Sequence, residues 1–127
     1  MQSITSPLAW FEIVTQDFER AIKFYETAFK IRFERHENEE MKHAIFPYIE
    51  GYTGGSLVHS RYYSDHQAGA GTVIIYLQTS SVSKQLKIIE QLGGEMVFPL
   101  TDIGENGYIA GFKDCEGNYI GLWSINP

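Results

Sequence analysis

Glu12 is the residue whose setting most suggests chemistry. It lies two residues after Trp10 in the run Ala-Trp-Phe-Glu-Ile-Val, residues 9–14, which is typical of a β-strand. Because alternate residues of a strand point to one face, Glu12 and Trp10 share a face. If that face lines an apolar cleft, burial would raise the pKa of the carboxyl group and suit it to act as a general base. A backbone amide, a tyrosine hydroxyl or a lysine at the cleft mouth would satisfy the same carboxylate without catalysis, so both interpretations stay open.

Two further polar side chains are candidates for ligand contact. Tyr76 lies 64 residues after Glu12 (76 − 12), and its phenol could hold a polar substrate group or close a hydrogen bond within the core. His59 lies in a strand expected over residues 56–61, and the sequence does not decide whether it faces a ligand or the surface. His43 and His66 match no zinc-binding motif, and the glycines near residue 54 lack the lysine of a phosphate-binding loop.

The composition bounds the class of protein. The chain has 127 residues, which predicts a single domain, and its net charge of −6 argues against a nucleic-acid partner. No apolar run reaches the roughly 18 residues of a membrane span, and no leader pattern precedes Leu8, so we expect a cytoplasmic protein that does not enter a membrane. The single cysteine, Cys115, cannot form a disulfide within the chain and is interpreted as incidental.

The elements that must position these side chains form two similar series. In the first, a helix with an apolar stripe follows the cap residue Asp17, and strands are expected over 31–35, 42–48 and 56–61. In the second, a buried strand over 72–79 is followed by a helix that Ser81 caps and Gly93 ends, and strands are expected over 95–98, 107–113 and 119–124, with a loop over 99–106.

The order β-α-β-β-β therefore occurs twice, in an α+β fold. Module one spans about residues 8–63, a polar glycine-rich linker about 64–71, and module two about 72–125. Trp10 overlays Ile74 and Phe18 overlays Val82 at one shift of 64 residues (74 − 10, 82 − 18). Each module alone would leave one sheet face uncovered, so two modules together predict a cleft or half-barrel in which a ligand would bind.

Several segments resemble the glyoxalase/bleomycin-resistance/dioxygenase superfamily, also called the vicinal oxygen chelate superfamily. Residues 10–26, with their acidic cap and a helix containing Phe-Tyr, resemble its opening strand and helix. Residues 71–94 are similar to the opening of its second module. Residues 103–110 and 114–123 resemble its closing hairpin, where Cys115 replaces the usual proline of Asp-Pro-x-Gly-Asn. The resemblance extends over about residues 8–125 and implies the fold more strongly than any one reaction.

The resemblance also implies where a divalent metal would bind. Metal-dependent members hold the ion with four His, Gln or Glu side chains, from the first and last strands of each module. Three of those positions fall on Trp10, Ile74 and Gly121, whose side chains cannot bind a metal, and the fourth lies within residues 56–59. We therefore expect no metal cofactor.

Two functional hypotheses follow. The first is a metal-independent protein that binds a small molecule in an aromatic-lined cleft. The second is an enzyme of the same superfamily, a lyase/isomerase or dioxygenase type, that uses displaced ligands or Glu12 as base. The resemblance further implies a homodimer. The residues expected to line the cleft are Trp10, Glu12, Phe46, His59, Tyr76, Tyr108 and Trp123.

Overall fold

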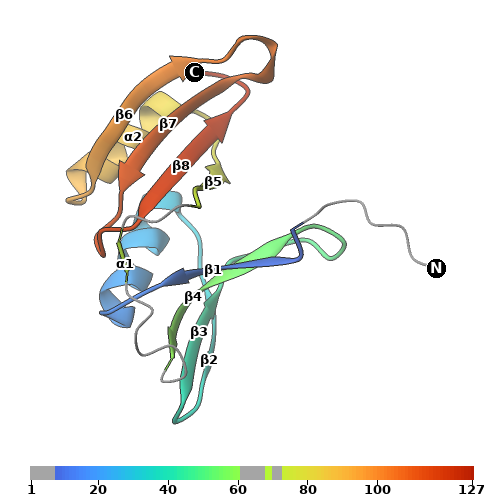
Figure 1. Cartoon of the computed structure of the whole chain (residues 1–127), viewed down its shortest axis with the longest axis vertical. Coiled ribbons are helices and arrows are strands. Elements are labelled where there is room, and N and C mark those ends of the chain that lie inside the picture. Colours follow the sequence, from blue (N-terminus) through green and yellow to red (C-terminus); the bar gives the residue numbers. More distant parts are fainter. Residues whose placement is uncertain (1–7, 61–67, 70–72) are drawn as a thin grey trace.

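The fold consists of two modules, each with one α-helix and four strands. Figure 1 shows their arrangement in this computed structural model. The structure describes residues 8–60, 68–69 and 73–127. In module one the elements are β1 (Trp10–Val14), α1 (Phe18–Phe29), β2 (Glu34–Glu37), β3 (Met41–Ile45) and β4 (Gly54–Ser60). In module two they are β5 (Ile75–Gln78), α2 (Val82–Gln91), β6 (Glu95–Asp102), the short 3-10 helix η1 (Gly104–Asn106), β7 (Tyr108–Lys113) and β8 (Tyr119–Ser124). The predicted double β-α-β-β-β order is confirmed.

Each module forms one mixed four-stranded sheet. The strand order is β1-β4-β3-β2 in the first sheet and β5-β8-β7-β6 in the second. The first strand of each module runs parallel to the last, and the remaining neighbours are antiparallel. The two sheets are therefore related by the same repeat that the sequence shows.

The two helices begin at equivalent places because each has a side-chain cap. The carboxylate of Asp17 accepts a hydrogen bond from the Arg20 backbone amide at 3.1 Å, and the Ser81 hydroxyl accepts one from the Lys84 amide at 3.3 Å. The first helical residues, Phe18 and Val82, are separated by the predicted 64 positions (82 − 18). Among the described residues, no helix is long and apolar enough to cross a membrane.

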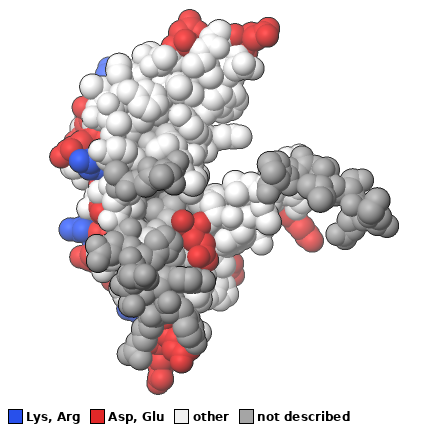
Figure 2. All heavy atoms as spheres, viewed as in Figure 1, with Lys and Arg blue, Asp and Glu red and all other residues white. Residues whose placement is uncertain are grey.

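Each sheet has one covered face and one uncovered face. The covered faces carry the core residues Ile13, Leu57, Ala110 and Leu122, which pack against the buried sides of the helices. We call the opposite surface of each sheet its open face. Figure 2 shows the molecule hollowed on the right, between module two above and the projecting end of module one. The open faces flank a half-barrel, which is the shape the sequence predicts.

Three strands of module one have boundaries that differ from the prediction. Residues 31–33 do not join a sheet, because Glu26 at the end of α1 accepts hydrogen bonds from both backbone amides that a strand would use. Its carbonyl oxygen binds the Ile31 amide at 3.2 Å and its side chain binds the Phe33 amide at 3.0 Å. β3 also ends at Ile45, before the predicted 48, and β4 begins at Gly54, before the predicted 56.

Two expectations for module two are also corrected. The segment expected to be a loop over 99–106 continues β6 as far as Asp102, because register shifts on either side of Phe98 place Pro99 where no backbone amide is required. The first strand of module two, Ile75–Gln78, is shorter than the predicted 72–79 and is not buried throughout, because Tyr76 is 46% exposed on the open face. Most of the predicted linker, residues 64–71, lies outside the described residues.

Candidate functional site

The open face of the first sheet carries a mixed aromatic and polar surface. Trp10 and Glu12 of β1 share this face, as the sequence predicts. The Trp10 ring contacts Tyr48 edge-on, with ring centroids 5.8 Å apart. A Cβ atom on Gly54, the β4 neighbour of Trp10, would lie within 3.0 Å of both rings. The absence of a side chain at Gly54 is therefore what allows the two rings to lie across β4.

A short polar row crosses the same open face. Ser56 of β4 pairs in register with Glu12 and is fully buried. The Ser56 hydroxyl oxygen lies 3.4 Å from Nδ1 of His43 on β3. The exposed Glu12 and the half-buried His43 could contact a polar group of a ligand, whereas the buried Ser56 hydroxyl lies against His43.

The open face of the second sheet is more aromatic. The Tyr76 ring lies across Gly121, where a Cβ atom would be 2.3 Å from its Cδ1 atom. Trp123 lies on the same face of β8, and its indole N–H donates to the Asn106 carbonyl at 2.7 Å. The Lys113 ammonium is 5.4 Å from the centroid of the Tyr119 ring. The rings and the fixed indole form a surface suited to a flat apolar ligand.

Three residues that we expected in the cleft lie on the covered side instead. Phe46 packs against Phe33 and Tyr25, with centroids 4.8 and 5.9 Å away, and so belongs to the core. Tyr108 packs against the same core on β7. His59 shares the face of the buried Leu57 on β4, and its Nδ1 lies 3.0 Å from the Thr15 carbonyl oxygen. Phe46 and Tyr108 are corrected, because strand alternation turns both side chains towards the helices. His59 stays exposed near the end of β4, so its contact with a ligand remains a prediction.

Four of the expected residues, Trp10, Glu12, Tyr76 and Trp123, lie on the open faces, and their contact with a ligand stays a prediction. Glu12 is exposed in the single chain, so the burial on which its role as a base depended is not present there. Sequence reasoning missed Ser56 and His43. The parallel register of β1 and β4, which sequence alone does not give, is what brings Ser56 beside Glu12.

The sheet registers also identify the fourth family metal position. In module two, Gly121 pairs with Tyr76, two residues beyond Ile74. The equivalent pairing in module one places Ser56 opposite Glu12, two residues beyond Trp10. The four positions are therefore Trp10, Ser56, Ile74 and Gly121. This set holds no imidazole, carboxylate or amide, so it does not fit the divalent metal of the superfamily. Within the described residues, no group of three His, Cys, Asp or Glu side chains is placed to hold a metal.

Cys115 is not an activated nucleophile. Burial, followed by the neighbouring charges of Asp114 and Glu116, raises the pKa of its thiol to about 12. A thiol with this pKa is protonated at neutral pH, which lowers its reactivity. The interpretation of Cys115 as incidental to catalysis agrees with this chemistry.

The fold and its two open faces define a class of proteins built from paired β-α-β-β-β modules. Residues 8–122 match the Glyoxalase/Bleomycin resistance protein/Dioxygenase superfamily, and the chain belongs to that superfamily. No curated protein matches the chain significantly.

Solved structures share this fold at low sequence identity. A superfamily member from Sphaerobacter thermophilus DSM 20745 is 20% identical, with a TM-score of 0.71 and coverage of 94% of this chain and 97% of its own. TnmS3, an antibiotic binding protein from Streptomyces sp. CB03234, is also 20% identical, with a TM-score of 0.71 and 99% coverage of both chains. An E144Q mutant of glyoxalase I from Zea mays is 23% identical, with a TM-score of 0.70 over 94% of this chain, which spans 47% of the maize protein. At these identities the likeness shows the fold alone.

Proposed function

We propose that this protein binds a small, partly aromatic molecule between the open faces of its two sheets, without the divalent metal of the superfamily. Two observations together carry the proposal. The open faces are aromatic, and the four residues at the family's metal positions lack imidazole, carboxylate and amide groups. Trp10, Tyr76 and Trp123 supply ring surface from both modules. Glu12, beside Ser56, would orient one polar or cationic group of the ligand.

Solved structures of this fold include both a small-molecule binding protein and enzymes. One structure of the same fold is described as an antibiotic binding protein, and others are described as glyoxalase I. The residue types at Trp10, Ser56, Ile74 and Gly121 favour the first kind for this chain, because they remove the groups that would hold a catalytic metal.

We further propose that the working unit is a homodimer. Among the residues that the structure describes, the most exposed large apolar side chains lie in the loop after β3 and just before β5. They are Ile49 at 72%, Tyr52 at 75% and Val73 at 76% exposure. Apolar surface in this position would be covered by a second copy that closes the half-barrel. Light scattering coupled to size exclusion should give twice the monomer mass, and a monomer at micromolar concentration would contradict this part of the proposal.

The cytoplasmic location stays a prediction, and cell fractionation would test it.

The chain provides its own optical probe for ligand binding. Its two tryptophans, Trp10 and Trp123, lie one on each open face. Titration with a panel of planar aromatic compounds in the presence of EDTA should quench or shift tryptophan emission for at least one compound. Tyr76→Ala should weaken that binding about tenfold, the usual effect of removing an aromatic anchor. Leu92→Ala, which removes another exposed apolar side chain at the end of α2, should not.

Metal analysis of the purified protein is the experiment that could refute metal-independent binding. Stoichiometric Ni, Zn, Fe or Mn that survives dialysis, and is lost in Glu12→Gln, would refute metal-independent binding. The same outcome would support the second candidate, an enzyme that uses displaced ligands on the open face.

The second candidate draws on the same sheet face, where Glu12 pairs in register with Ser56 and the Ser56 hydroxyl lies against the His43 ring, so a carboxylate and an imidazole belong to one face. Turnover of a glyoxalase-type or dioxygenase-type substrate that is abolished in Glu12→Gln, with substrate binding retained, would establish it.

A further inference from the structure

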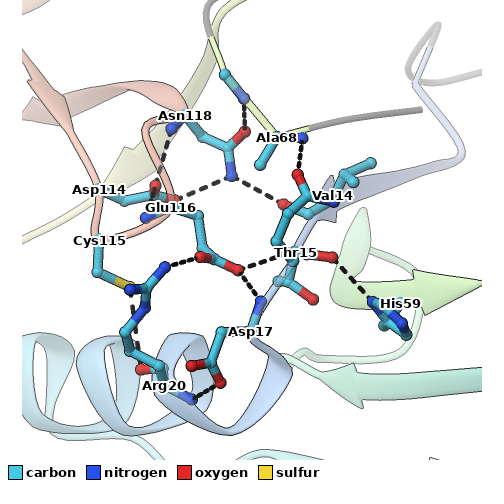
Figure 3. A network of polar contacts seen from close by, with 12 residues as sticks. Val14, Thr15, Asp17, Arg20, His59, Ala68, Asp114, Cys115, Glu116 and Asn118 are labelled. Atoms are coloured by element: carbon cyan, nitrogen blue, oxygen red, sulfur yellow. Dashed lines mark hydrogen bonds and ion pairs between the residues drawn. The ribbon is translucent and has the colours of Figure 1, made fainter. Parts of the chain in front are cut away.

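The turn between β7 and β8 inserts a carboxylate into the start of α1 in the other module. Figure 3 shows Glu116 among the residues that precede and open this helix. Its Oε1 accepts hydrogen bonds from the backbone amides of Gln16 and Asp17, each at 2.5 Å. Its Oε2 forms an ion pair with the Arg20 guanidinium. The Glu116 side chain is only 1% exposed, whereas that of Arg20 is 54% exposed. A buried carboxylate with three donors is a strong attachment between the modules.

Asn118, from the same turn, makes a second attachment. Its side-chain amide donates to the Val14 carbonyl at 2.9 Å, at the end of β1, while its oxygen accepts from the Gly69 amide at 2.8 Å. Asn118 directly precedes β8, so this bond joins the end of β1 to the beginning of β8.

The turn itself is held rigid by Asp114. The Oδ1 atom of Asp114 accepts from the backbone amides of Glu116 and Asn118, at 2.8 and 2.9 Å. Its Oδ2 atom accepts from the hydroxyl of Tyr25, a fully buried residue in the middle of α1, at 2.7 Å. Burial raises the pKa of Tyr25 well above its ordinary value, so the phenol keeps its proton and remains a donor.

The far end of α1 is attached to module two as well. The side-chain amide of Gln85, on α2, donates to the Ala28 carbonyl at 2.6 Å. Module two therefore contacts α1 at its start, middle and end through polar side chains. Such a helix cannot tilt relative to the second sheet without breaking hydrogen bonds that water would not easily replace.

We propose that Glu116 and Asn118 are positioning residues that set the separation of the two open faces. Both act on the junction where β1 enters α1, and β1 carries Trp10 and Glu12 into the proposed site. Their effect on the geometry is independent of any ligand. Their effect on affinity rests on the proposed function. Glu116 and Asn118 lie in the turn between β7 and β8 rather than on an open face, so their effect on binding is indirect.

The separation of the sheets can be measured directly. Nitroxide labels at Glu39 and Glu105, introduced as cysteines in a Cys115→Ser background, would report on the exposed tips of the two modules. Double electron–electron resonance then gives the distance distribution. Labelled protein is diluted with an excess of unlabelled protein, so that distances between copies of a dimer do not contribute.

Glu116→Ala and Asn118→Ala should each shift or broaden the distance distribution while circular dichroism remains native. Glu90→Ala, which removes an exposed carboxylate on α2, should leave the distribution unchanged. A folded Glu116→Ala protein with the parental distribution would overturn the proposal. If that variant does not fold, Glu116→Gln replaces it. This change keeps the side-chain shape but removes the charge that pairs with Arg20, and an unaltered distribution in Glu116→Gln would overturn the proposal equally.

Binding is measured separately with the best compound of the tryptophan titration. Glu116→Ala should lower its affinity about tenfold, although Glu116 does not contact the ligand. Unchanged affinity in a protein with a broadened distribution would refute the influence of the junction on the site. If no compound binds the parental protein, the proposed function fails, while the distance measurement still decides whether the junction sets the geometry.

Discussion

Tyr25→Phe removes one buried hydroxyl and tests the energetics of the junction between the modules. The hydroxyl donates to Oδ2 of Asp114 at 2.7 Å, and Tyr25 has no exposed surface. A hydrogen bond to a charged acceptor typically contributes about 1.5–3 kcal/mol. Oδ2 keeps a weaker bond from the Asn118 amide at 3.2 Å, and Oδ1 keeps two backbone amides. We therefore expect a loss at the lower end, about 1–2 kcal/mol near neutral pH.

The pH dependence of this loss follows from Asp114. Burial raises the pKa of its carboxyl group above 3.8, and the hydrogen bond from Tyr25 opposes that rise. Removing the hydroxyl therefore raises the folded-state pKa further. A raised folded-state pKa gives stability that is present below the unfolded pKa and is lost as pH rises through the folded pKa. The Tyr25→Phe protein should thus lose most stability relative to the parent above that pKa, and less in acid.

Urea unfolding followed by circular dichroism at several pH values measures both effects. Tyr119→Phe is the matched control, because its ring keeps the contact with Lys113 and no hydrogen bond of its hydroxyl is described. It should change the free energy of unfolding by less than about 0.5 kcal/mol. The loss of unfolding free energy caused by Tyr25→Phe should shrink as the pH falls towards the unfolded-state pKa of Asp114. A loss that stays constant or grows would refute the reasoning.

Two further predictions concern single positions. Cys115 should react with iodoacetamide far more slowly in the folded protein than in urea, because its thiol is half-buried with a pKa of about 12, and intact-mass spectrometry follows the reaction. Equal rates in both states would contradict this. Gly121→Ala should displace the partly exposed Tyr76 ring at a cost of about 1–2 kcal/mol of stability or less. It should weaken ligand binding clearly while lowering the melting temperature only slightly. Unaltered binding would show that Tyr76 does not need its present position.

The sequence predicted the helices better than the strand limits. Both helices begin where Asp17 and Ser81 predict, because a cap is a local signal that the chain carries within four residues. Strand limits depend on partners distant in the chain. The extension of β6 through Pro99 was missed because the bulge beside it exists only when β6 pairs with β7.

The candidate site was predictable in part, for the same physical reason. Alternation correctly placed Trp10 and Glu12 on one face, since both belong to one continuous strand. It failed for Phe46 and Tyr108, because which face of a strand is covered depends on where the helix packs. The sequence around Glu116 predicts only a turn. Its contacts with α1 could not be predicted, because its partners lie 96–100 residues earlier in the chain.

The insertion of Glu116 into the start of α1 also has a consequence for how the chain folds during synthesis. The amides of Gln16 and Asp17 are made about 100 residues before the carboxylate that accepts their hydrogen bonds. An emerging first module therefore has its helix and its Asp17 cap but lacks the group that attaches the helix start to module two. Closing this long loop late should make the two modules acquire their final structure together, in one cooperative step rather than one after the other.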